Sequence, residues 1–161
     1  MLTLQGGNMN VMKLLLWVLI WQVPMWMGAQ IVQTNMNWYH TLQQPFFSPP
    51  DWLFGTVWAV LYILLALAGF YLTRNGLNAS NQKATWLMLV QLVLNAMWTP
   101  LFFGWHHLTI AMVWIVLMIA TTIWLMRAAK PVSRTAMWLL VPYLAWLCFA
   151  WVLNTSMWLM N

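Results

Sequence analysis

Apolar residues along this chain fill long, nearly unbroken runs instead of alternating or recurring on one helical face. Five runs cover about residues 11–32, 52–72, 84–103, 109–126 and 136–160. Because a membrane-spanning helix needs about 20 mostly apolar residues, each run is long enough to cross a bilayer. The pattern therefore predicts an all-α membrane protein, a single domain over residues 1–161 built as a bundle of five transmembrane helices.

The polar segment between the first two runs is unusually long and reads "QTNMNWYHTLQQPFFSPPD". Pro45, Pro49 and Pro50 stiffen it and prevent it from continuing a helix. Trp38 lies early in the segment and contributes to its aromatic bulk, and Asp51 stands where an N-cap of the second helix is expected. We expect a long structured loop that covers a cavity between the helices as a lid.

Composition and charge agree with a membrane protein and suggest its orientation. Residues are 64% hydrophobic and 4% charged, which excludes soluble and disordered classes. All six lysines and arginines fall at the N-terminus or in the second and fourth linkers: Lys13, Arg74, Lys83, Arg127, Lys130 and Arg134. This bias predicts a cytoplasmic N-terminus and a C-terminus on the opposite side. Because the cations form no stripe, no nucleic-acid partner is expected. Cleavage of the first run as a signal peptide is the alternative.

The third run carries two amides that are costly to expose to lipid. Gln91, Asn95 and Trp98 recur at i, i+4 and i+7 and so share one face. The amides either hydrogen-bond to neighbouring helices or face a ligand, and the sequence leaves both open. Pro100 predicts a kink at the end of this helix.

The second and fifth runs carry aromatic stripes. Trp58 and Tyr62 are i, i+4 neighbours on the second. The fifth, in which Pro142 predicts a kink, shows a helical stripe of large and small residues made of Tyr143, Trp146, Ala150 and Leu153. A small residue between bulky ones admits either a neighbouring helix or a flat ligand.

The chain lacks the residues that conventional catalytic sites and metal sites need. Asp51 is the single carboxylate, so no paired-carboxylate site can form. His40 and the adjacent pair His106 and His107 have no metal-ligand spacing, and no metal site is expected. The lone Cys148 lies in an apolar run and predicts no intramolecular disulfide. The residues favour a hydrophobic binding cavity.

Three motifs in order resemble one known family. "WYHTLQQPFFSPPDWLFGTVWAVLY" resembles the first-loop and second-helix signature of the TspO/translocator protein family, the tryptophan-rich sensory proteins related to the peripheral-type benzodiazepine receptor. "LNAMWTPLFFG" resembles its third-helix motif, and "PYLAWLCFAWVLN" resembles its fifth-helix motif. Together they cover most of residues 38–154.

The resemblance implies a five-helix bundle, commonly a homodimer in the lipid bilayer, with a tryptophan-rich pocket under the first loop. It implies porphyrins and other tetrapyrroles, such as protoporphyrin IX or haem, as ligands, with no cofactor required. On matching positions, the ligand-binding residues are Trp38, Trp58, Tyr62, Asn95, Trp98, Trp146, Ala150 and Leu153. Trp58 and Trp146 match the positions of family tryptophans that are associated with light-dependent porphyrin breakdown.

The chain also departs from the family pattern. Gln44 stands where the family usually has a basic residue, and Phe47 stands where a tryptophan is usual. After "VLN", the tyrosine and cation of the animal cholesterol motif are replaced by Thr155, Ser156 and Leu159. Cholesterol binding through that motif is therefore not expected, and a bacterial membrane is the expected location.

Three functions follow as hypotheses. The first is tetrapyrrole binding with a sensory or regulatory role, in which indoles stack on the flat ligand. The second is light-dependent porphyrin degradation, with Trp58 and Trp146 as the photochemical residues and no conventional catalytic residue. The third is transport of porphyrins or other lipophilic molecules.

Overall fold

The structure, a computed structural model, describes the backbone of residues 2–161 and the side chains from residue 9 onward. Its elements are α1 (Leu2–Tyr39), α2 (Asp51–Thr73), α3 (Gln82–Thr99), η1 (Pro100–Gly104), α4 (Leu108–Ala129), α5 (Arg134–Leu139) and α6 (Val141–Met160). In this part of the chain, five helical segments are long and apolar enough to cross a membrane, with α3 running into η1 and α5 into α6. The prediction of an all-α, five-span bundle is confirmed.

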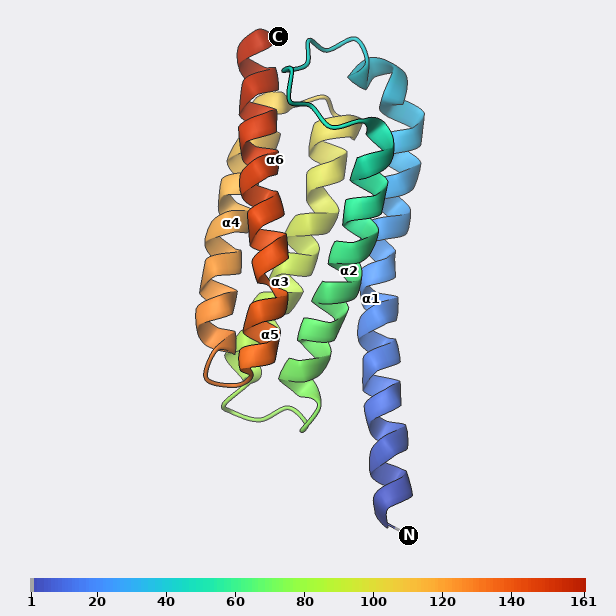
Figure 1. Cartoon of the computed structure of the whole chain (residues 1–161), viewed down its shortest axis with the longest axis vertical. Helices are drawn as coiled ribbons and strands as arrows, with labels where there is room; N and C mark the ends of the chain where they lie inside the picture. The colour runs from blue at the N-terminus through green and yellow to red at the C-terminus, as the bar shows by residue number, and fades with distance from the viewer. Residues whose placement is uncertain (1) are drawn as a thin grey trace.

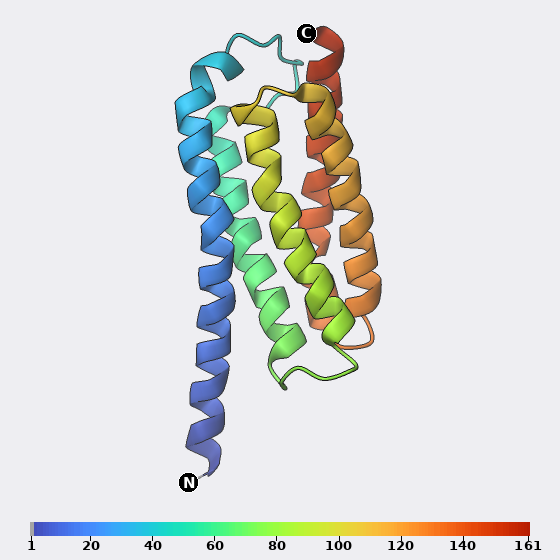
Figure 2. The same ribbon diagram turned by 180° about the vertical axis from the view of Figure 1, so that it is seen from behind.

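The helices run side by side and alternate in direction along the chain, and α1 extends beyond the ends of the others toward the N-terminus (Figures 1 and 2). The connection between α1 and α2 crosses the far end of the bundle, near the C-terminus (Figure 1). We call residues 40–50 the strap.

The strap is shorter than the predicted loop because α1 runs on to Tyr39. Polar residues in the added turns bond to their own helix: Thr34 Oγ1 donates to the Gln30 carbonyl at 3.1 Å, and Asn35 Nδ2 donates to the Ile31 carbonyl at 2.8 Å. No proline or glycine interrupts residues 29–44, so helix continuation costs little. The placement of Trp38 in the loop was therefore wrong, because it lies in the last turn of α1.

Asp51 is not the N-cap of α2. Pro50 holds that position with extended backbone angles, and Asp51 is the first helical residue. Its carboxylate accepts no capping bond and lies 2.8 Å from His40 Nε2 across the strap. The predicted charge placement holds nevertheless, because an acid in the first turn suits the helix dipole.

Pro100 and Pro142, where the sequence predicted kinks, both lie where the regular α-helix is interrupted. After Thr99 the chain forms a π-helix over Pro100–Gly104, closed by the Trp105 amide donating to the Pro100 carbonyl at 2.8 Å. The last span breaks at Leu140, and Pro142 sits in the first turn of α6. Proline is tolerated there because a first-turn N–H has no helical partner to lose.

A buried polar network ties α2, α3, α4 and α6 together. The Tyr143 hydroxyl oxygen accepts from Gln91 Nε2 at 2.8 Å and from Asn95 Nδ2 at 3.2 Å. Tyr62 donates to Asn95 Oδ1 at 2.9 Å, and Thr121 donates to Gln91 Oε1 at 2.6 Å. Both amides of the third span thus bond between helices, which is one of the two alternatives that the sequence left open.

Candidate functional site

Next to the strap, the helices enclose a cavity of about 500 Å³. Its walls come from α1, α2, α3, η1, α4 and α6. This volume lies within the range of small-molecule and cofactor sites, about 300–1,000 Å³. Most lining side chains are aliphatic or aromatic, so the cavity suits a large apolar ligand.

Aromatic rings from α2 and α6 form one wall. The ring centroids of Trp58 and Tyr62 lie 5.4 Å apart, as their i, i+4 spacing predicts. Trp58 meets Trp146 edge to face at 6.5 Å and 85°, and Phe54 meets Trp146 at 6.0 Å. Such edge contacts fix the ring planes of neighbouring aromatics.

The opposite wall depends on the π-helix. Trp98 stacks on Phe102 with centroids 5.2 Å apart, and Phe103 lies 6.2 Å from Trp98. Tyr39, at the end of α1, lies 5.5 Å from Phe103. In an α-helix, Trp98 and Phe102 already share a face; the wider turn also brings Phe103 to the cavity.

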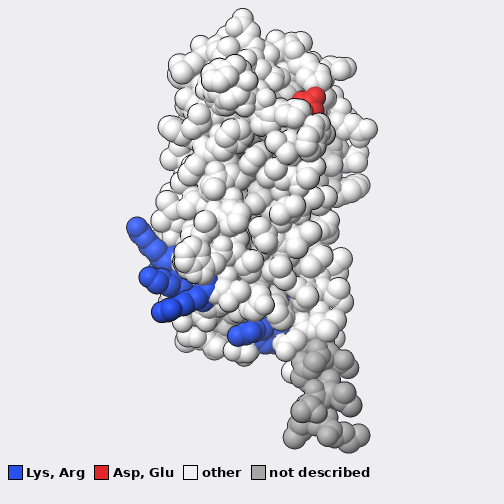
Figure 3. Space-filling view, in the orientation of Figure 1, with Lys and Arg blue, Asp and Glu red and all other residues white. Residues whose placement is uncertain are grey.

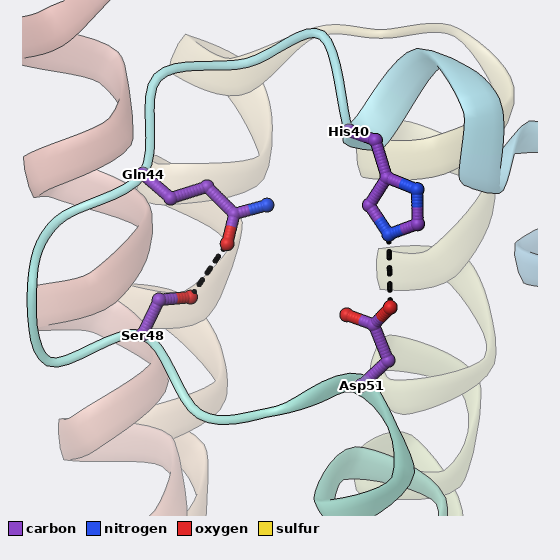
Figure 4. Close-up of polar contacts among 4 residues, drawn as sticks. All are labelled: His40, Gln44, Ser48 and Asp51. Atoms are coloured by element: carbon purple, nitrogen blue, oxygen red, sulfur yellow. Dashed lines mark hydrogen bonds and ion pairs between the residues drawn. The ribbon is translucent and has the colours of Figure 1, made fainter.

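Polar contacts hold the strap to the first turn of α2 and to the C-terminal residue. The His40–Asp51 contact joins its two ends, and Ser48 Oγ donates to Gln44 Oε1 at 2.9 Å within it (Figure 4). Gln43 exchanges two hydrogen bonds with the Asn161 side chain, at 2.9 and 3.1 Å. None of residues 40–50 lines the cavity, which the strap reaches only through the flanking residues Tyr39 and Asp51. The strap therefore borders the cavity and does not roof it as the predicted lid would.

Comparison with known proteins decides the family. The sequence matches the TspO/MBR family over residues 14–159, nearly the whole chain. This chain belongs to the TspO/MBR family.

Its relatives in this family span archaea, bacteria and animals. The chain is 37% identical to the tryptophan-rich protein TspO of Archaeoglobus fulgidus, over 95% of this chain and 99% of the relative. It is 37% identical to the human translocator protein, over 81% and 79% of the two chains. It is 35% identical to the tryptophan-rich sensory protein of Cereibacter sphaeroides, over 73% of each. Together with the five apolar helices, membership identifies an integral membrane protein that crosses the bilayer several times.

The structure brings six of the eight residues suggested by family resemblance to the cavity. They are Trp58, Tyr62, Trp98, Trp146, Ala150 and Leu153. Asn95 does not line it, because its amide is used between Tyr62 and Tyr143. Trp38 does not line it either; its ring stacks on His106 with centroids 3.9 Å apart, on the connection between η1 and α4.

Several lining residues were missed from the sequence. Phe54, Phe102 and Phe149 add aromatic surface, and Asn154 on α6 adds a polar group. Asn154 was detectable, because it continues the helical face of Trp146 and Ala150 at i+8 and i+4. Among the described side chains, both polar atoms of Asn154 and the Nε1 of Trp98 are buried with no hydrogen-bond partner. Unpaired buried polar atoms are costly, so these residues are candidates for contact with polar atoms of a ligand.

Proposed function

We propose that this TspO/MBR protein binds a tetrapyrrole, such as protoporphyrin IX or haem, in the cavity beside the strap and has a sensory or regulatory role. The observation that carries the proposal is an apolar cavity of about 500 Å³ lined by the indoles of Trp58, Trp98 and Trp146. Flat rings gain both area burial and stacking against such walls. The name of the Cereibacter relative, tryptophan-rich sensory protein, supports the sensory role.

Quenching of tryptophan fluorescence by protoporphyrin IX tests this proposal in purified protein. Binding in the cavity predicts saturable quenching, with affinity reduced several-fold in Trp58→Phe. Trp138→Phe is the matched control, because Trp138 is 65% exposed on α5 and does not line the cavity. Non-saturable quenching, or equal effects of the two substitutions, would contradict binding at this site.

A second candidate function is light-dependent porphyrin degradation. The edge contact of Trp58 with Trp146 at 6.5 Å favours it, because a porphyrin bound in the cavity would lie against two neighbouring indoles. Light-excited porphyrin can oxidise an indole or generate reactive oxygen, with molecular oxygen as the oxidant. The test is loss of porphyrin absorbance in light, with dark and oxygen-free controls. Unchanged loss in the Trp58→Phe, Trp146→Phe double variant would exclude a role for these residues.

Transport of porphyrins is suggested by the name of the human relative, translocator protein. Its test is porphyrin flux into proteoliposomes, and equal flux with and without the protein would exclude it.

We also propose that the N-terminal end of the bundle faces the cytoplasm. The lysines and arginines gather at that end and the acid lies near the other (Figure 3). Cytoplasmic ends of membrane proteins are enriched in lysine and arginine. Fusions to the C-terminus test the orientation in bacterial cells: alkaline phosphatase should be active there and green fluorescent protein dark. The reverse result would contradict it.

A further inference from the structure

The single side-chain carboxylate of the chain lies at the edge of the cavity. Asp51 is the only aspartate or glutamate in the sequence, and it is a lining residue. Its side chain is 47% exposed, so the cavity meets the surface there. We call this edge, marked by Asp51 and His40, the rim.

All six lysines and arginines belong to the described side chains from residue 9 onward, and none of them lies near the rim to balance this charge. One cation, Lys13, lies in α1, and the other five lie in or beside the α2–α3 and α4–α5 connections. All are at the end of the bundle opposite the strap (Figure 3). Besides Asp51, the titratable side chains at the strap end are Tyr39, which also lines the cavity, and three histidines. His40 contacts Asp51 at 2.8 Å, His106 stacks on Trp38 and bonds with Asn35, and His107 precedes α4. The Asp51 carboxylate at the rim therefore has only a histidine, and no lysine or arginine, in contact with it.

Ligand charge matters most at this position. The interior of the cavity is apolar, so ionised groups of a bound ligand remain at the rim, where water reaches them. An anionic group there lies near the Asp51 carboxylate and is repelled by it. Because Asp51 is half exposed, solvent and salt weaken the repulsion without removing it.

We propose that Asp51 is a specificity-determining residue that makes the cavity disfavour anionic ligands and favour flat ligands whose rim-facing groups are uncharged. The inference rests on the proposed tetrapyrrole site and refines it. Among porphyrins of the same ring, the neutral ester is favoured by Asp51 over the dicarboxylate.

The test compares protoporphyrin IX with its dimethyl ester, which has the same ring and no carboxylates. The two ligands partition differently into detergent, so the informative quantity is the change that a substitution causes for each ligand. At about pH 8, above the range in which histidines ordinarily titrate, Asp51→Asn should raise affinity for protoporphyrin IX by about two- to fivefold. It should leave affinity for the dimethyl ester unchanged, and added salt should reduce the difference.

Two further variants separate charge from a loosened strap. His40→Gln breaks the same 2.8 Å contact but keeps the carboxylate, so it should not raise affinity for protoporphyrin IX. Lys130→Gln removes an exposed charge at the opposite end and should change neither ligand. Equal gains for both porphyrins in Asp51→Asn, no gain for either, or the same gain in His40→Gln would overturn the proposal. Absence of saturable binding of either porphyrin to the wild type would instead overturn the tetrapyrrole site itself.

Discussion

Helices α1 and α2 approach so closely at Gly69 that a single methyl group should disturb them. A Cβ built on Gly69 would lie 2.5, 2.6 and 2.8 Å from three ring carbons of Trp17. Trp17 is 6% exposed and is held in place by its Nε1, which donates to Thr73 Oγ1 at 2.8 Å. The ring therefore cannot turn away without losing a buried hydrogen bond.

The magnitude for Gly69→Ala follows from these distances. Carbon atoms in contact prefer about 3.5–4.0 Å, so the ring or the helix must retreat by about 1 Å. Overpacking of this kind costs about 1–3 kcal/mol, and alanine returns about 0.5–1 kcal/mol through its better helix propensity. The two ranges combine to a net loss of about 0–2.5 kcal/mol in the free energy of unfolding, so we expect Gly69→Ala to be about 1 kcal/mol less stable than the wild type.

Gly55 supplies a matched control in the same helix. A Cβ there meets nothing within 4 Å, so Gly55→Ala should leave stability unchanged or raise it by up to about 1 kcal/mol. The assay is reversible unfolding in mixed detergent and dodecyl sulfate micelles, followed by tryptophan fluorescence. Equal stability of the two variants would refute the close approach of α1 and α2, and with it the position of one wall of the cavity.

Three other predictions concern the polar network, the cavity and the strap. Tyr143→Phe removes the acceptor of two buried amides, of which Asn95 Nδ2 has no other partner among the described residues and Gln91 Nε2 keeps only the Met118 carbonyl at 3.4 Å, and it should lower the free energy of unfolding by about 1–3 kcal/mol. Porphyrin affinity should change little, and a large loss of affinity without destabilisation would contradict a structural role. Ala150→Leu adds bulk to the cavity wall and should weaken protoporphyrin IX binding about tenfold in fluorescence titrations, with unchanged affinity as the contrary result. Asn161→Ala releases Gln43 and should speed proteolysis within the strap, whereas Ser156→Ala, whose hydroxyl bonds only to its own helix, should not; equal cleavage rates would contradict the fastening.

Much of the fold was predictable because the backbone hydrogen bonds of a membrane helix all lie within its own segment. Five apolar runs and the cations between them predict the spans, since backbone groups in lipid must be satisfied within each helix. Boundaries near polar residues were harder to place. α1 continues to Tyr39 because its Thr34 and Asn35 side chains bond to their own helix, so polarity alone did not mark its end.

The site was predictable only where a helical face decides it. The i, i+4 pair Trp58 and Tyr62 share the cavity, as their spacing requires. Asn95 lies on the same face as Trp98, yet it bonds to Tyr62 and Tyr143 because those hydroxyls happen to lie within reach across α2 and α6. Whether a buried amide bonds to a neighbouring helix or faces the cavity depends on how the helices cross. The spacing of residues along one helix does not determine that crossing.

A structure of the protein with protoporphyrin IX tests most directly whether a flat ligand occupies the cavity beside the strap. We expect density for the ring inside the cavity, against Trp58, Trp98 and Trp146, with its carboxylates toward the rim. Porphyrin density only on the lipid-facing surface, with the cavity empty of ligand, would contradict it.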